Sequence, residues 1–65
     1  MKLGSLKEGE RDGTLVVVSR DLTRAVRAAG IAPTLQRALE DWSNVAPRLN
    51  ALSEALNDGS ADGLL

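Results

Sequence analysis

Acidic residues at alternate positions are the first pattern in this 65-residue chain that could do chemistry. Glu8, Glu10 and Asp12 precede a glycine, and this spacing resembles the opening of a calcium-binding loop. The likeness ends at Ser19, which stands where such a loop needs a bidentate glutamate. The flanking segments also have the composition of strands, whereas this kind of loop joins two helices. We therefore interpret residues 7–13 as a solvated hairpin turn and predict no metal ligand there.

The chain contains no histidine and no cysteine, which limits what its other polar residues can do. Thiolate and imidazole metal sites, cysteine nucleophiles and histidine bases are all excluded. The adjacent residues Glu40 and Asp41 would point in different directions on a helix, so they do not form an acid and base pair. No serine has a histidine to activate it, which excludes Ser5, Ser19, Ser43 and Ser53 as nucleophiles. We predict no catalytic, cofactor-binding or metal-binding residue in this chain.

Three arginines could bind a carboxylate or a phosphate if they shared a helical face. Arg20, Arg24 and Arg27 have that spacing, but no glycine-rich phosphate loop supports an anion site. We therefore predict that they form surface or interdomain ion pairs. Residues 20–30 are ambiguous, because Asp21 could cap a short helix that ends at Gly30, whereas the alternation through residues 23–27 fits a short third strand. Periodicity leaves both alternatives open.

The first third of the chain has the pattern of a β-hairpin. Residues 2–6 alternate in hydropathy, residues 14–19 are rich in β-branched side chains, and the connection ends in Asp12-Gly13, a dipeptide favoured by turns. The second strand carries three successive valines, so we expect both of its faces to be covered. An isolated hairpin is marginally stable, and something else must pack on it.

The second half of the chain predicts two helices. Leu35, Ala38, Leu39 and Trp42 have the spacing of one helical face, and Thr34 is placed to cap it. A second helix is predicted to end near Asn57. Its apolar face is formed by Val45, Leu49, Leu52 and Leu56, and Gly59 is its expected terminating residue.

Pro47 interrupts these two patterns. Because proline is harmless only in the first turn of a helix, we place the break near Ser43 or Asn44. The fold class that follows is α+β, with a small β-hairpin or three-stranded meander followed by two short helices.

Composition restricts the partners that this chain can have. Its net charge is −1 and it has one aromatic residue, which disfavours nucleic-acid binding. Residues 1–37 carry seven basic and four acidic side chains, whereas residues 38–65 carry one basic and five acidic ones. No apolar run approaches a membrane span and the N-terminus lacks a signal peptide's apolar region, so we expect a cytoplasmic protein that does not enter a membrane.

The predicted core is small for a self-sufficient domain. Nine of its apolar residues are alanines, and chains of this length usually need a partner, a metal or disulfides. Trp42 is expected to be buried, either in the core or against a partner. We predict a partner interface that includes the following residues: Trp42, Leu35, Leu39, Leu49 and Leu52.

Segments from most of the chain resemble a known family: Met1-Lys2-Leu3, Leu6-Lys7, Arg11-Asp12-Gly13, Leu15-Val16-Val17-Val18-Ser19-Arg20-Asp21-Leu22, Ile31-Ala32-Pro33-Thr34-Leu35-Gln36, Ala38-Leu39-Glu40-Asp41-Trp42 and Ala46-Pro47-Arg48-Leu49. Their order and spacing resemble the N-terminal region of bacterial fumarylacetoacetate hydrolases. The resemblance implies a parent enzyme that hydrolyses a carbon–carbon bond in a β-diketo acid, giving fumarate and acetoacetate in tyrosine breakdown. It also implies a β-meander, which favours a short strand near residues 24–27.

The resemblance places the chemistry outside this chain. In the family a divalent cation, magnesium or calcium, is held by acidic residues that include a Glu-x-Glu pair, and a histidine activates water, all in a C-terminal catalytic domain. Glu8-Gly9-Glu10 imitates that pair in the wrong domain. We expect residues 1–58 to form the N-terminal domain and residues 59–65 to begin the linker to the catalytic domain. That catalytic domain is the expected partner. The chain alone would be no enzyme and would hold no cofactor. The alternative is a free-standing helical module that dimerises without catalysis.

Overall fold

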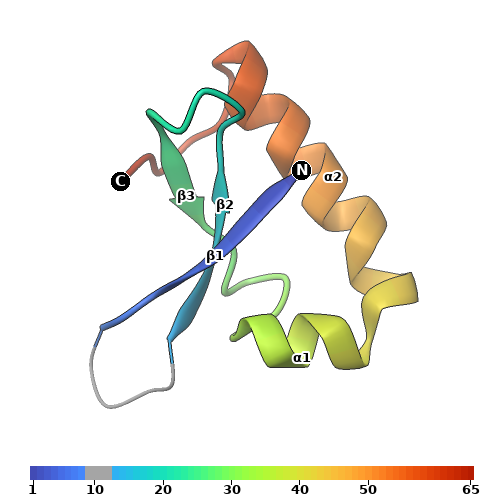
Figure 1. The fold of residues 1–65 in the computed structure, drawn as a ribbon. Coiled ribbons are helices and arrows are strands. Elements are labelled where there is room, and N and C mark those ends of the chain that lie inside the picture. The colour runs from blue at the N-terminus through green and yellow to red at the C-terminus, as the bar shows by residue number, and fades with distance from the viewer. Residues whose placement is uncertain (9–12) are drawn as a thin grey trace.

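The computed structural model describes residues 1–8 and 13–65, which form a three-stranded antiparallel sheet followed by two helices (Figure 1). The predicted α+β class and the meander are confirmed. The predicted solvated turn and the Glu8-Gly9-Glu10 pattern fall mainly on residues 9–12, which lie outside the described residues. The elements in chain order are β1 (Lys2–Leu6), β2 (Thr14–Val18), β3 (Ala25–Arg27), α1 (Leu35–Glu40) and α2 (Trp42–Asp58).

The sheet follows the order β1-β2-β3, so the valine-rich strand lies in the centre. Leu3 lies opposite Val17, and Val17 in turn lies opposite Val26, so these three side chains share one face. Gly13 enters β2 at φ 130°, where a Cβ atom would stand 3.0 Å from the Cβ of Ser5. Glycine is therefore required there by both the backbone and the space.

The ambiguous segment after β2 contains a strand. β3 pairs antiparallel with β2, and the N–H of Ala28 continues the contact by donating to the carbonyl of Leu15 at 2.8 Å. A helix over residues 22–29 would have left this edge of β2 without a partner strand, and backbone pairing of a buried strand outweighs the weak helical spacing. The helical alternative, with Asp21 as its cap, is wrong.

The helix break lies at Asp41, two to three residues before the predicted position. Its φ of −130° ends α1, and its carbonyl accepts the N–H groups of Asn44 and Val45 at 3.0 and 3.1 Å, which closes the first turn of α2. Pro47 consequently lies inside α2 and not in its first turn. The predicted cap of α1 is confirmed, because the Thr34 hydroxyl accepts the Arg37 N–H at 3.2 Å.

One face of α2 supplies the core, as its spacing predicted. Leu49 and Leu56 are fully buried and Val45 nearly so, and they pack with Leu15 and Val17 of β2. Ala38 of α1 joins the same cluster, so both helices lie on one side of the sheet (Figure 1). The predicted terminating glycine is confirmed, because Gly59 takes a left-handed φ of 88° and donates its N–H to the carbonyl of Ala55.

The last residues return to the sheet. After Gly59 the chain folds back, and Leu64 forms an isolated antiparallel bridge with Val26 of β3. The N–H of Leu65 donates to the carbonyl of Ala25 at 2.9 Å, so the C-terminus lies beside β3 (Figure 1). The last two residues of the segment predicted to begin a linker are thus held along the outer edge of β3.

Candidate functional site

The residues predicted to form an interface divide into a buried and an exposed set. Leu49 is fully buried in the core of this chain, and Leu35 and Leu52 are half-buried against that core. Leu39 is 62% exposed and Trp42 is 39% exposed. The prediction of Trp42 as a core residue of this chain is therefore wrong, whereas its burial against a partner stays a prediction.

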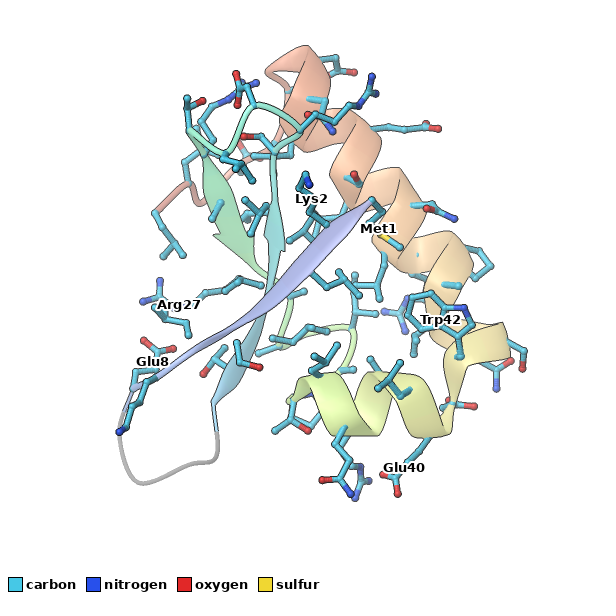
Figure 2. All side chains as sticks on the ribbon, in the orientation of Figure 1. Met1, Lys2, Glu8, Arg27, Glu40 and Trp42 are labelled. Atoms are coloured by element: carbon cyan, nitrogen blue, oxygen red, sulfur yellow. The ribbon has the colours of Figure 1, made fainter. Side chains whose placement is uncertain are left out.

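The break at Asp41 explains the exposure of Trp42. On an unbroken helix Trp42 would follow Leu35 and Ala38 on the core face, but it instead begins α2, which runs in another direction (Figure 2). Leu39, in the last turn of α1, is also exposed, so two apolar side chains lie open at the junction of the two helices, with Glu40 and Asp41 between them in the sequence. We call residues 39–42 the α1–α2 corner; it combines two apolar side chains with two carboxylates.

The sheet has a second face that the two helices do not cover. Val16 and Gly4 lie opposite each other, as do Val18 and Ala25, and directly paired residues share a face. These residues do not belong to the buried core between the sheet and the helices. Val16 is 6% exposed, whereas Val18 and Ala25 are half-buried. We call Gly4, Val16, Val18 and Ala25 the second sheet face. Lys2 pairs with Val18 and Arg27 pairs with Val16, so this face is apolar along β2 and carries two charged side chains on the outer strands.

An ion pair crosses one end of this second sheet face. The Arg27 guanidinium donates from Nε and Nη2 to the two carboxylate oxygens of Glu8, at 3.0 and 2.9 Å (Figure 2). The Arg27 guanidinium, followed by the Thr14 hydroxyl, holds the pKa of Glu8 below its usual value, and Glu8 raises the pKa of Arg27. The prediction of an ion pair is confirmed for this arginine, which is on a strand.

The turn between β2 and β3 is built around one carboxylate oxygen. Oδ1 of Asp21 accepts the Ser19 hydroxyl at 2.6 Å, the Thr23 hydroxyl at 2.7 Å and the Thr23 N–H at 3.1 Å. These hydrogen bonds, the Ser19 bond first, lower the pKa of Asp21 to about 2. Oγ of Ser19, which is fully buried, also accepts the N–H of Arg24 at 3.0 Å. Ser19 is therefore a structural residue of this turn.

The same turn holds Leu22 in an unusual state. Its φ is 63°, in the left-handed region that branched and bulky residues rarely adopt, and its side chain is 67% exposed. The Leu22 N–H donates to the carbonyl of Ser19 at 3.0 Å, which closes the turn. The turn thus exposes the apolar side chain of Leu22 to solvent, on a backbone that hydrogen bonds hold in place.

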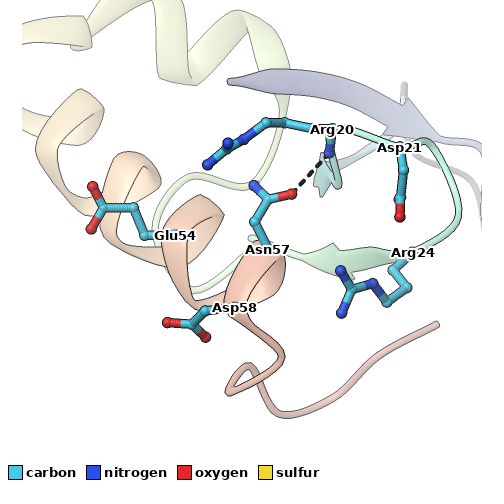
Figure 3. Close-up of a pocket in the computed structure, with 6 residues that line it drawn as sticks. All are labelled: Arg20, Asp21, Arg24, Glu54, Asn57 and Asp58. Carbon is cyan, nitrogen blue, oxygen red and sulfur yellow. Dashed lines mark hydrogen bonds between the residues drawn. The ribbon is translucent and has the colours of Figure 1, made fainter.

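An open depression of about 510 Å³ lies between this turn and the last turn of α2 (Figure 3). The N–H of Arg20 donates to Oδ1 of Asn57 at 2.9 Å and joins the two elements. Arg20 and Arg24 line the depression and form no ion pair with another described residue. Its remaining lining residues are acidic or amide side chains, namely Asp21, Glu54, Asn57 and Asp58. Mixed charge makes this a polar contact surface.

Within residues 1–8 and 13–65, no group of three carboxylates is placed to hold a metal ion. Glu8 is engaged by Arg27, so its carboxylate has a structural partner. Among the described helices none is long and apolar enough to cross a membrane.

Sequence reasoning missed three features of these surfaces: the exposure of Leu22, the identity of Glu8 as the partner of Arg27, and the return of the chain end to β3. The first had a local signal, because Ser-x-Asp-x-Thr places three side chains that commonly hydrogen bond to nearby backbone in turns. The other two join residues that are far apart in the chain, so spacing could not indicate their partners.

The fold and these surfaces define a small α+β module with partly open apolar surfaces rather than a built catalytic centre among its described residues. The sequence model of the family described as fumarylacetoacetase N-terminal domain 2 matches residues 1–64. The chain belongs to this family. No curated protein matches it in sequence.

Proposed function

We propose that this chain is the non-catalytic N-terminal domain of a cytoplasmic enzyme that hydrolyses a carbon–carbon bond of fumarylacetoacetate, giving fumarate and acetoacetate in tyrosine breakdown. The family match over residues 1–64 supports this proposal. The magnesium or calcium ion of such an enzyme, with the histidine that activates water, would belong to the catalytic domain. The residues of this chain do not fit that metal, because its described carboxylates form no suitable cluster.

The second sheet face is the surface that we propose for docking to the catalytic domain. β2 is apolar on both faces, whereas the helices cover the face that carries Val17. Val18 and Ala25 remain half-buried on the other face, and closing such a face against a second body would remove their apolar area from water. β2 carries apolar side chains on both faces but only one face is covered by the helices, and the docking proposal depends on this observation.

The return of the chain end to β3 agrees with this arrangement. Leu65 is hydrogen bonded to Ala25, at the edge of the second sheet face. In the proposed enzyme, a following domain would therefore be connected at the margin of the surface on which it packs. A short, ordered connection of this kind lowers the entropy lost on docking.

Two experiments test the proposal. Reading the gene beyond codon 65 is expected to show a catalytic domain with a Glu-x-Glu pair and a histidine, and a stop codon directly after codon 65 would refute the assignment. In the whole enzyme, Val18→Asp is expected to loosen the N-terminal domain, seen as a separate unfolding transition in calorimetry. Ala51→Asp, on the exposed side of α2, is the matched control and should leave a single transition. If both variants behave alike, the second sheet face is not the docking surface.

A second candidate function, a dimerising module without catalysis, is favoured by the α1–α2 corner. The apolar face of α2 is already used inside the chain, since Val45, Leu49 and Leu56 are buried. Leu39 and Trp42 are exposed and remain available to another protein.

A further inference from the structure

We propose that Asp62 is a site of isoaspartate formation, at which the main chain is rerouted through the Asp62 side chain. Asp62 is followed by Gly63, and both are exposed residues of the segment after α2, outside the described helices and strands. This modification needs no partner, metal or cofactor. It does not depend on the proposed function, so either can fail while the other holds.

The reaction has two steps and uses only water. The backbone nitrogen of Gly63 attacks the side-chain carboxyl carbon of Asp62, where a C–N bond forms, the C–OH bond breaks and one water molecule leaves with the amide proton. The product is a five-membered succinimide ring. Water then adds to one of its two carbonyl carbons. Opening at the α-carbonyl breaks its bond to the Gly63 nitrogen and leaves an isoaspartyl linkage, whereas opening at the other carbonyl restores aspartate.

Both reacting groups at Asp62 are unoccupied. Among the hydrogen bonds of the described residues, none is donated by the Gly63 N–H and none is accepted by the Asp62 carboxylate. Glycine has no side chain to obstruct the approach to its nitrogen. Gly63 has a φ of 74°, and a Cβ atom placed there would meet nothing within 4 Å. The carboxyl group and the nitrogen therefore have the space that ring closure requires.

A second Asp-Gly pair in the same chain is protected. The Gly59 N–H donates to the carbonyl of Ala55, which directs it along α2. Oδ1 of Asp58 accepts the Ser60 hydroxyl at 2.6 Å and the Ser60 N–H at 2.9 Å. These bonds, the hydroxyl bond first, hold the pKa of Asp58 below its usual value, so less of it is in the protonated form that loses water. Reaction at Asp58 must wait until the end of α2 opens.

The other residues that could form a succinimide are less favourable. All three asparagines, Asn44, Asn50 and Asn57, lie within α2 and precede residues that carry a side chain. A helical backbone keeps each following N–H in a hydrogen bond to an earlier carbonyl. Asp12 also precedes a glycine, but it lies outside the described residues. Asp62 is therefore the site that the described structure favours.

Conversion of Asp62 is expected to detach the chain end from β3. An isoaspartyl linkage adds one carbon atom to the main chain between Asp62 and Gly63. Leu64 is held by a single bridge to Val26, and the Leu65 N–H by one bond of 2.9 Å to the carbonyl of Ala25. Strand pairing depends on residue spacing, so an added carbon just before the bridge disrupts it. Leu64 and Leu65 are 51% and 53% exposed, so little burial opposes their release.

Ageing of the 65-residue chain in mildly acidic buffer at body temperature tests the proposal. Proteolysis followed by electron-transfer mass spectrometry distinguishes isoaspartyl from aspartyl linkages and assigns each to its residue. Isoaspartate is expected to accumulate about fivefold or more faster at Asp62 than at Asp58, which reacts only after local opening. In concentrated urea the two rates should become similar. Equal rates in the folded chain, or none at Asp62 while the chain in urea converts, would overturn the proposal.

Asp62→Glu is the matched variant, because glutamate keeps the charge but would have to close a less favourable six-membered ring. The isomerised linkage at this position should be lost, and the rate at Asp58 should stay as it was. An undiminished rate of isomerisation at position 62 would contradict the succinimide route.

NMR spectra of the separated isoaspartyl form test its effect on the fold. The backbone amide shifts of Ala25 and Val26 should change on conversion, whereas those of Val45 and Leu49, in the core, should not. Unchanged shifts at Ala25 and Val26 would overturn the detachment of the chain end from β3.

Discussion

Arg27 and Glu8 join the two outer strands of the sheet across the central one. Arg27 belongs to β3 and Glu8 follows β1, yet two hydrogen bonds of 3.0 and 2.9 Å connect their side chains over β2. Both side chains are partly exposed, so water and salt screen their attraction.

Removing this ion pair is expected to lower stability slightly and in a pH-dependent way. The folded pKa of Glu8 lies below its unfolded value, so the contribution of the pair is present above the unfolded pKa of 4.5 and is lost as pH falls through the folded pKa. A double-mutant cycle of Glu8→Gln and Arg27→Gln, measured by urea denaturation at pH 7 and pH 3, should show coupling at pH 7. Equal coupling at both pH values would contradict the ion-pair account.

Asp21 should titrate far below an ordinary aspartate. Its folded pKa is about 2 against 3.8, so the unfolded state binds more protons between these values and stability falls as pH drops through that window. We expect NMR titration of the Asp21 carboxyl carbon to show a midpoint near 2. In Ser19→Ala, which removes the first of its hydrogen bonds, the midpoint should rise toward 3.8. A midpoint near 3.8 in the unmodified chain would be inconsistent with the turn described here.

Replacing Leu22 by glycine is expected to stabilise the fold. The left-handed φ of 63° costs a leucine roughly 1 kcal/mol, and glycine avoids this cost. Because glycine also makes the unfolded state more flexible, which offsets part of the benefit, the net gain in stability should be about 0.5 kcal/mol. Leu39→Gly is the matched control, since Leu39 is similarly exposed but helical, and it should lose about 1 kcal/mol. Chemical denaturation measures both, and a loss in both variants would remove the argument for strain at Leu22.

Leu49 and Trp42 should respond differently to truncation although the sequence predicts both at the interface. Leu49→Ala leaves a cavity in a fully buried site and should cost about 2–5 kcal/mol, a large share of the stability of so small a domain. Trp42→Ala removes a side chain that is 39% exposed and should cost less. Thermal melts followed by circular dichroism compare the two; a greater loss for Trp42→Ala would place the tryptophan in the core after all.

Pro47→Ala tests the position of the helix break. Pro47 lies inside α2, where it cannot donate an N–H to the carbonyl of Ser43, so alanine is expected to stabilise the chain by about 1–3 kcal/mol. If α2 instead began near Asn44, Pro47 would occupy its first turn and the substitution would bring little gain. Denaturant midpoints of Pro47→Ala and the unmodified chain distinguish these boundaries.

Local pattern is sufficient for most of the elements in this chain. The hairpin strands, the Thr34 cap, the buried stripe through Val45, Leu49 and Leu56, and the terminating Gly59 all follow from interactions between residues within a few positions of one another. The absence of histidine and cysteine limits the available chemistry whatever fold the chain adopts. The fold class and the family likeness therefore follow from the sequence by itself.

Tertiary structure decided the features that depend on partners distant in the chain. Residues 25–27 became a strand because the open edge of β2 needed backbone partners, although their spacing also allowed a helix. Trp42 became exposed because the chain turned at Asp41 and not two or three residues later, and nothing in the side-chain periodicity distinguished these positions. The pairing of Arg27 with Glu8 and of Leu64 with Val26 likewise arose only when the strands came together. Hydrophobic periodicity encodes which face of an element is apolar, but the folded backbone decides which apolar face is covered and which remains for a partner.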